Sequence, residues 1–191
     1  NNNGILDKKF SKSDKDSTEL EITLYASDLA ELEKIANILK QQWEAIGGVK
    51  VNVEIQDRKE LRQKVIKTRE FDALLFGSLL YMDPDQFSYW HSSQKKDPGL
   101  NLSMYDNPDV DKLLEDARQA LDYKERIKKY DAFQQIIVED VPAIFLFNPH
   151  YLYVVRGQIK GVDVKKIAIS SKRFTGIEKW HIKTRRQLKS E

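Results

Sequence analysis

The feature that most constrains the fold is a change of hydrophobic period between residues 19 and 56. Leu20 to Leu24 alternate between apolar and polar residues, which predicts a strand. Apolar residues then recur at helical spacing from Asp28 to Ile46, and Gly47-Gly48 ends that helix. Val49 to Ile55 alternate again. Because parallel strands need a crossover of a dozen or more residues, this order predicts a parallel βαβ unit.

The first helix has both a start signal and an apolar stripe. Ser27 and Asp28 are good N-caps, and Glu31 stands where a capping box would need it. Burial of such side chains stabilises a fold by roughly 1.5 to 3 kcal/mol each, so we expect the stripe to form core, Trp43 included. The stripe consists of Leu29, Leu32, Ala36, Leu39, Trp43 and Ile46.

A third strand follows a short helix. The helix is predicted from about Arg58 to Thr68. Phe71 to Gly77 is a nearly continuous apolar run, typical of a strand buried on both faces. The sheet should therefore contain at least three strands.

The second half of the chain predicts two helices and two extended segments. Asn107-Pro108 caps one helix, and Asp122 starts another that Pro142 stops. Ala143 to Asn148 and Tyr151 to Val155 are apolar and β-prone, which predicts a strand followed by a bend and another extended segment. Beyond Gly161 the pattern weakens, and the basic residues 183–189 are expected to be a solvated tail.

Composition excludes several classes of function. Lys and Arg total 32 against 30 Asp and Glu, and this mixed charge gives no argument for a nucleic-acid partner. No cysteine is present, which rules out disulfides and zinc-thiolate sites. No apolar run is long enough to cross a bilayer. The opening residues 1–4 have the chemistry of a turn and not of a signal peptide, so we expect a fragment.

Motifs for enzymes, cofactors and metals are missing. The three histidines lie far apart, and neither a phosphate loop nor a Gly-x-Ser-x-Gly elbow occurs. Asp83 and Asp85 flank Pro84, where turn chemistry is favoured over acid-base catalysis. We therefore predict a protein that is not an enzyme and that uses no cofactor.

The stretch from Gly77 to Phe87 is the most informative for function. It follows the carboxyl end of the buried strand, the edge at which ligands collect in open α/β sheets. Its apolar and aromatic residues could form the wall of a ligand pocket or could plug the sheet, and the sequence favours neither.

From Leu20 to about Gly161 the order of elements resembles the C-terminal lobe of the family 5 extracellular solute-binding proteins, which serve peptide and nickel importers. The matching pieces are collinear. They are Gly4 to Lys8, Phe71-Asp72, Asp83 to Phe87, Tyr105 to Leu114, Arg126, Tyr130, Glu139 to Pro142 and Lys160-Gly161.

The resemblance implies an α/β fold of the periplasmic-binding-protein type II kind, with a mixed sheet and flanking helices. It divides the chain into a lead-in (1–17), the C-terminal lobe (18–149) and a segment that crosses back toward an N-terminal lobe and ends in the basic tail (150–191). The implied protein is extracytoplasmic, periplasmic or anchored as a lipoprotein. It would bind a peptide or another small solute and deliver it to the membrane subunits of an ABC importer.

The resemblance also implies which residues face the ligand. In order, they are Ser78, Leu79, Leu80, Tyr81, Met82, Trp90, His91, Asn101 and Ser103. Two departures from the family pattern concern ligand binding. One is the absence of the aromatic residue usual at the start of the following family helix, where this chain has Asp57 to Glu60. The other lies after Gly77. Ser78 replaces a tryptophan common in peptide binders of the family, and Leu80 or Tyr81 stands where an aspartate would pair with the terminal ammonium. An alternative is therefore a protein-interaction or structural domain that keeps the fold without binding solute.

Overall fold

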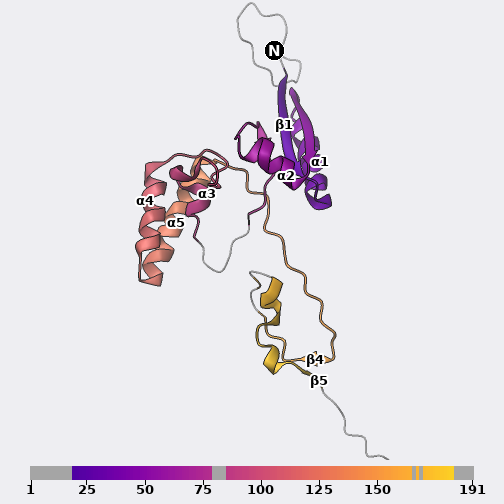
Figure 1. Cartoon of the computed structure of the whole chain (residues 1–191), viewed down its shortest axis with the longest axis vertical. Coiled ribbons are helices and arrows are strands. Elements are labelled where there is room, and N and C mark those ends of the chain that lie inside the picture. The colour runs from indigo at the N-terminus through magenta and orange to yellow at the C-terminus, as the bar shows by residue number, and fades with distance from the viewer. Residues whose placement is uncertain (1–18, 79–84, 165–166, 168–169, 183–191) are drawn as a thin grey trace, which may run out of the picture. The chain divides into compact units, whose positions relative to one another are not determined.

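The computed structural model describes residues 19–78, 85–164, 167 and 170–182 (Figure 1). These residues belong to two compact units. The first contains the described residues up to Pro142, and the second begins at Ala143.

The first unit opens with the predicted βαβ arrangement, formed by β1 (Leu20–Ser27), α1 (Ala30–Glu44) and β2 (Val49–Gln56). β1 pairs in parallel with β2 along its whole length, from Leu20 opposite Val49 onward. β3 (Ala73–Leu74) pairs in parallel with the other side of β1, which gives the strand order β2-β1-β3. The prediction of one sheet for these three strands is confirmed.

The core of the sheet is formed with α1. Its buried side chains are Leu24, Ala26, Ala36, Leu39, Val51 and Leu75. Leu32, Ile35 and Trp43 pack against them from α1. The prediction that the whole stripe forms core is wrong at its two ends, because Leu29 is 42% exposed and Ile46, which follows the helix, is 55% exposed. Trp43 is a packing residue, as predicted.

The predicted start of α1 is wrong. The N-cap position is Leu29, and it has no side-chain cap. Ser27 is buried in β1 opposite Gln56, and the Asp28 amide donates to the Gln56 carbonyl at 3.0 Å. Both residues extend the strand ladder and are not available for a capping box. At the other end, Gly47 and Gly48 have φ of 83° and 73°, which confirms the predicted glycine stop.

A short helical segment leads to the third strand. It consists of α2 (Arg58–Glu60) and the π-helix η1 (Leu61–Ile66), and the Asp57 side chain caps it by accepting from two backbone amides. The following strand is shorter than predicted and is not buried on both faces. Phe76 is 43% exposed, and β3 pairs only with β1 among the described strands, so it forms an edge of this sheet.

The rest of the first unit is helical. It contains α3 (Phe87–Trp90), the 3-10 helix η2 (Ser92–Gln94), α4 (Pro108–Gln119) and α5 (Tyr123–Asp140). The predicted caps are confirmed, because Asn107 accepts from the Asp109 amide at 3.0 Å and Asp122 from the Glu125 amide at 2.9 Å. α4 and α5 pack side by side around the buried Val110, Leu114, Ala117, Tyr130, Phe133 and Ile137.

The second unit contains little regular structure. β4 (Ile159–Lys160) pairs antiparallel with β5 (His181–Ile182), and η3 (Ser170–Phe174) and η4 (Ile177–Lys179) lie between them in the chain. The prediction of a strand at 143–148 is wrong, and the segment predicted as extended at 151–155 forms no strand within the described residues either. A strand requires a hydrogen-bonded neighbour, and within the described residues neither segment has one. In the part of the chain that the structure covers, no helix is long and apolar enough to cross a membrane.

Candidate ligand-binding site

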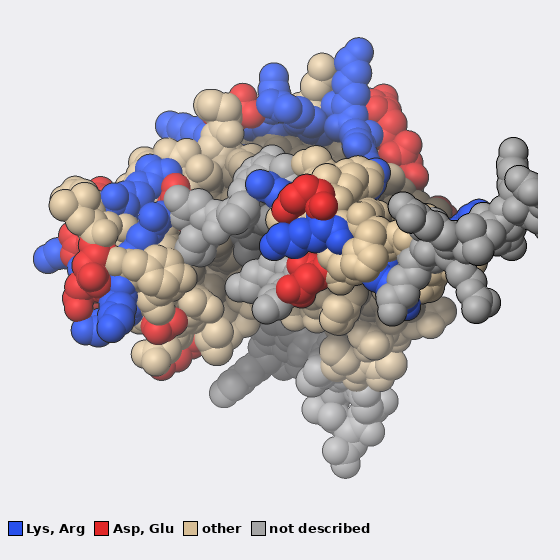
Figure 2. Space-filling model, turned by 90° about the horizontal axis from the view of Figure 1, so that it is seen from below, with Lys and Arg blue, Asp and Glu red and all other residues tan. Residues whose placement is uncertain are grey.

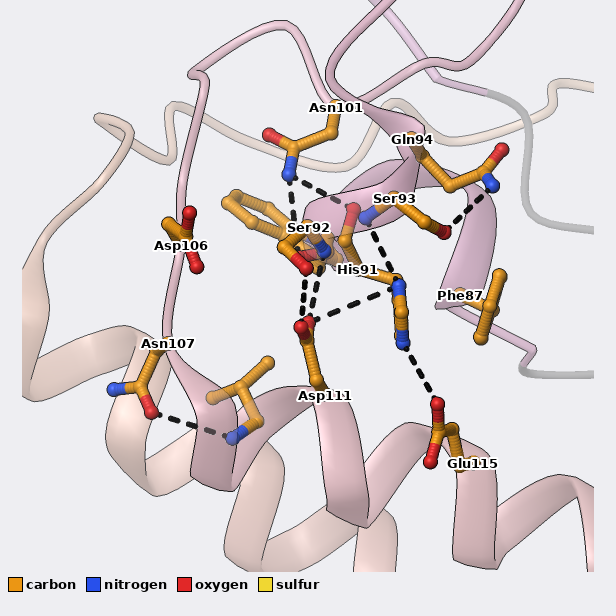
Figure 3. Close-up of polar contacts among 12 residues, drawn as sticks. Phe87, His91, Ser92, Ser93, Gln94, Asn101, Asp106, Asn107, Asp111 and Glu115 are labelled. Atoms are coloured by element: carbon orange, nitrogen blue, oxygen red, sulfur yellow. Dashed lines mark hydrogen bonds and ion pairs between the residues drawn. The ribbon is translucent and has the colours of Figure 1, made fainter.

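Asn101 is hydrogen-bonded to three other predicted ligand-facing residues, Trp90, His91 and Ser103. Figure 3 shows its side chain beside His91. Its side chain is completely buried. The Asn101 amide group donates to the carbonyls of Tyr105 at 2.9 Å, His91 at 3.1 Å and Trp90 at 3.3 Å. Its Oδ1 accepts from the Tyr105 amide at 3.1 Å and from the Ser103 hydroxyl at 3.3 Å. Asn101 thus holds residues 90–105, here called the Trp90 loop, in a single folded shape.

His91 is buried beside α4 and is held in one tautomer. Its Nδ1 accepts from the Ser93 amide at 3.1 Å, so the ring proton lies on Nε2 and is donated to Glu115 Oε1 at 3.2 Å. The ring stacks on Phe87 with centroids 4.0 Å apart. These contacts fix the ring on three sides, as Figure 3 shows.

One face of α4 receives the segment that carries His91. Asp111, Glu115 and Arg118 are spaced at i, i+4 and i+7, and each bonds to a residue between 85 and 92. Asp111 accepts from the Ser92 amide at 2.8 Å and also from the Ser92 hydroxyl. Arg118 forms a two-pronged pair with Asp85, and its guanidinium lies 3.8 Å from the centre of the Phe87 ring.

Asp85 is held in its charged form. Burial acts to raise its pKa, but hydrogen bonds from Arg118 and from the Phe87 amide, together with the Arg118 charge, lower the pKa below the usual aspartate value. Its Oδ1 accepts from the Phe87 amide at 3.1 Å, at the start of α3. This is the chemistry of a turn and helix start, and a carboxylate paired in this way is a poor proton donor.

Trp90 is positioned by an aromatic and acidic cluster at the ends of α4 and α5. Its ring meets Tyr105 edge-on, with centroids 6.3 Å apart. The Tyr105 hydroxyl and the Asn107 amide both donate to Asp140. Burial and the bond to Asp140 raise the pKa of Tyr105 to about 12, and the same bond lowers the pKa of Asp140. Trp90 is half-buried and also packs against the core of α4 and α5.

The predicted site residues fall into three groups. Trp90, His91, Asn101 and Ser103 lie together in the Trp90 loop. Ser78 is exposed after the carboxyl end of β3, and no described contact joins it to that loop. Leu79, Leu80, Tyr81 and Met82 lie outside the described residues, as do Asp83 and Pro84.

Two arginines that the sequence did not single out organise this region. Arg118 lies 33 residues from its partner Asp85, and Arg69 lies 26 and 30 residues from the carbonyls of Lys95 and Gly99 that it contacts. No periodic pattern connects residues at such separations, so only the folded structure reveals them.

The described residues include no metal cluster, and the face drawn in Figure 2 has charges of both signs. Within the described ranges, no group of three or more histidine, aspartate and glutamate side chains could hold a metal ion. On the face drawn in Figure 2, basic and acidic side chains are interspersed. The Trp90 loop thus offers hydrogen-bonding and aromatic groups held in a fixed shape. Such groups suit recognition of a small polar molecule by direct contacts, and not its attraction by a surface of one charge.

The chain belongs to the bacterial extracellular solute-binding proteins of family 5. The sequence model of that family's middle region matches residues 3–99, about half of the chain. The solved neighbours are proteins of this type, and the predicted family and α/β fold class are confirmed.

Similarity to individual proteins extends further along the chain. The oligopeptide-binding protein AppA of Bacillus subtilis is 32% identical over 182 residues, which cover 94% of this chain and 31% of AppA. The solved structure of AppA in complex with a nonapeptide matches 96% of this chain and 34% of that one, with a TM-score of 0.65 and 31% identity. The probable D,D-dipeptide-binding protein DdpA of Escherichia coli is 32% identical over 115 residues, 60% of this chain and 22% of DdpA.

NikZ of Campylobacter jejuni, solved in complex with Ni(L-His), matches 87% of this chain and 34% of its own with a TM-score of 0.60. Its identity is 24%, so this likeness supports the fold alone. The chain spans about a third or less of the length of these relatives.

Proposed function

We propose that this chain is the ligand-contacting C-terminal lobe, with the returning segment, of a peptide-binding component of an ABC importer. The observation that carries the proposal is the match to AppA, which runs through 94% of the chain in sequence and 96% in structure. Such a match includes both the βαβ part and the Trp90 loop. A relative that shared only the fold would not align so continuously at this level of identity.

In this proposal the peptide is held between two lobes. Ser78 to Met82 and the Trp90 loop contribute contacts from this side, and an N-terminal lobe contributes the others. Among the predicted residues of the Trp90 loop, Ser103 is exposed and Trp90 is half-buried, so these two can reach a ligand. His91 and Asn101 are buried and act by holding that loop in shape. Closure is stabilised by contacts that exist only when both lobes touch the peptide.

The returning segment supports the presence of a second lobe. Its apolar side chains are exposed, with Leu152 at 86% and Val154 at 93%. Apolar surface on a contiguous β-prone segment normally marks an interface. We propose that the N-terminal lobe covers this segment, with the crossing near Pro149 and His150. The first compact unit ends at Pro142, and the lobe boundary at 149 stays a prediction.

The remaining parts of the proposal follow from the relatives. DdpA and the SapA protein of Haemophilus influenzae are named as periplasmic. We propose an extracytoplasmic location, periplasmic or lipid-anchored, and the membrane subunits of an importer as partners. The relatives are solute-binding proteins, and we propose binding without turnover and without nucleic acid.

Native mass spectrometry of the two-lobed protein, purified without denaturation, tests this function. We expect bound masses that fit peptides and that leave when the protein is unfolded. A bound mass with the isotope pattern of a nickel-histidine complex would show that the ligand is a metal chelate and not a peptide. If the protein neither retains a small molecule nor releases heat with a random nonapeptide pool, the proposed function is wrong.

A further inference from the structure

Arg69 has a backbone conformation that an arginine adopts only at a cost. Its φ is 63°, in the left-handed region that favours glycine, and its amide donates to the Val65 carbonyl at 3.0 Å at the end of the η1 segment. A glycine at this position would end the helix without that strain. The arginine side chain must therefore offer something that a glycine could not.

The guanidinium of Arg69 contacts three backbone carbonyls. Its Nε donates to Lys95 at 2.9 Å, its Nη2 to Gly99 at 2.6 Å, and its Nη1 to Ile66. Two of these carbonyls belong to the Trp90 loop, and the third belongs to the helix that Arg69 ends. Burial lowers the pKa of Arg69, and the Asp97 carboxylate opposes that effect, so the charge is partly compensated by its surroundings.

The Trp90 loop is shaped to meet this side chain. A Cβ on Gly99 would lie 2.2 Å from the Gln94 carbonyl, so only glycine fits there. The backbone amide of Gly99 donates to the Lys96 carbonyl at 2.8 Å, and the backbone amide of Asn101 donates to the Gln94 carbonyl at 3.1 Å. These turns leave the carbonyls of Lys95 and Gly99 within reach of one guanidinium, in the fork geometry that arginine provides and lysine does not.

We propose that Arg69 is a positioning residue for ligand binding, which fastens the Trp90 loop to the part of the lobe that contains β1, β2 and β3. This inference rests on the proposed function, in which the loop contributes contacts to the peptide. A loop fastened in advance loses less conformational freedom when the ligand arrives, so the fork contributes to affinity without touching the ligand.

A simpler role for Arg69 would be only to cap its own helix through the Ile66 carbonyl. The variant Arg69→Gly distinguishes this capping role from the positioning role. If capping is the whole role, Arg69→Gly relieves the strained backbone and leaves the loop unchanged. If the fork positions the loop, the amides of Gly99, Leu100 and Asn101 should exchange with deuterium roughly tenfold faster or more, because charged hydrogen bonds to the loop are lost. Arg69→Lys keeps the charge but not the fork, and should behave like Arg69→Gly.

Val141→Gly is the matched control. Val141 also has a left-handed backbone at a helix end, with φ of 48°, and it has no guanidinium to lose. The same variants in the two-lobed protein are titrated with a random nonapeptide pool by calorimetry. We expect Arg69→Gly and Arg69→Lys to weaken binding roughly tenfold and Val141→Gly to leave it unchanged, with unfolding midpoints of all three measured in parallel.

The two readouts distinguish the inference from the function beneath it. Unchanged exchange of the loop amides in Arg69→Gly overturns the fork. Faster exchange with unchanged peptide affinity overturns the positioning role. If the wild-type protein binds no peptide, the proposed function fails and the ligand role with it, whereas faster exchange would still support the fork that holds the loop.

Discussion

At the scale of single residues, Asn101 is the position at which a change of very few atoms should have the largest effect. Asn101→Asp replaces the amide that donates to three carbonyls by an oxygen that repels them. We expect the free energy of unfolding to fall by about 2 to 4 kcal/mol, since a buried donor set is lost and a charge is buried. Urea unfolding midpoints measure the loss.

The control for Asn101 is Asn52→Asp. Asn52 is exposed on β2, so the same change of chemistry should shift the free energy of unfolding by less than about 0.5 kcal/mol. Equal midpoint shifts for the two variants would show that burial of Asn101 does not hold the Trp90 loop together.

Val141 stores backbone strain at the end of α5. It is a β-branched residue with φ of 48°, at a position where helices favour glycine. Val141→Gly should raise the free energy of unfolding by about 0.5 to 1 kcal/mol. Val138→Gly, at an exposed position inside the same helix, should lower it by about 1 kcal/mol. Thermal unfolding of both variants gives the sign of each change in the free energy of unfolding. A loss of stability in both variants would show that the backbone of Val141 is not strained.

Residue roles were predictable where the signal is local in the sequence. Asn107, Asp122 and Gly47 could be assigned because a cap or a stop depends on the next three or four residues. The resemblance placed Asn101 among the ligand-facing residues, but its role in holding the loop could not be predicted, because its hydrogen-bond partners are set by the folded backbone. The left-handed backbone of Arg69 is likewise invisible, since arginine rarely adopts it.

At the scale of elements, the pair between Arg118 of α4 and Asp85 before α3 makes stability depend on pH. The pKa of Asp85 in the folded chain lies below its ordinary value of 3.8. The unfolded chain therefore binds a proton first as the pH falls. The stabilisation is complete well above pH 3.8 and is lost as the pH falls through the lower folded value.

Asp85→Asn should therefore destabilise the chain at neutral pH and flatten the loss of stability below about pH 5. Asp109→Asn, at an exposed position on α4, serves as the control and should retain the wild-type slope. The measurement is the urea midpoint from pH 2 to 7. The same slope for Asp85→Asn and wild type would show that the Arg118 pair contributes nothing to folding.

Helices were predicted better than strands for a physical reason. α1, α4 and α5 satisfy their own backbone hydrogen bonds, so the apolar period indicates all three, and the caps indicate the starts of α4 and α5 but not that of α1. β1 and β2 were found because the chain itself supplies both partners through one crossover. The segments at 143–148 and 151–155 have the composition of strands, but composition cannot supply a neighbour.

At the scale of the whole molecule, the candidate site was predicted only in part. The sequence placed Ser78 after a strand and the Trp90 loop further along, and the structure joins Trp90, His91, Asn101 and Ser103 through one side chain. The sequence could not show that His91 and Asn101 are buried and hold the loop in shape. A ligand cleft is a property of surfaces that come from distant segments, so its residues cannot be sorted by local pattern.

The proposed division of the ligand between two lobes leads to a prediction for the chain alone. If a complete site binds a peptide with micromolar affinity, about −8 kcal/mol, half of the contacts would give roughly −4 kcal/mol, near millimolar. One lobe also leaves the other side of the ligand in water. We therefore expect calorimetry with a random nonapeptide pool to detect only feeble binding by residues 1–191 and strong binding by the two-lobed protein.

Within the two-lobed protein, alanine at both Tyr81 and Met82 should weaken peptide binding, because contacts with the ligand are lost. Alanine at Asp85 should act mainly on stability, because Asp85 pairs with Arg118 and accepts from the Phe87 amide at the start of α3. Calorimetry and unfolding midpoints on both variants separate the two effects. Unchanged affinity in the Tyr81/Met82 variant would move the site away from residues 78–82. Micromolar binding by the isolated chain would show that a single lobe supplies the whole site, and the exposed returning segment would then need a different explanation.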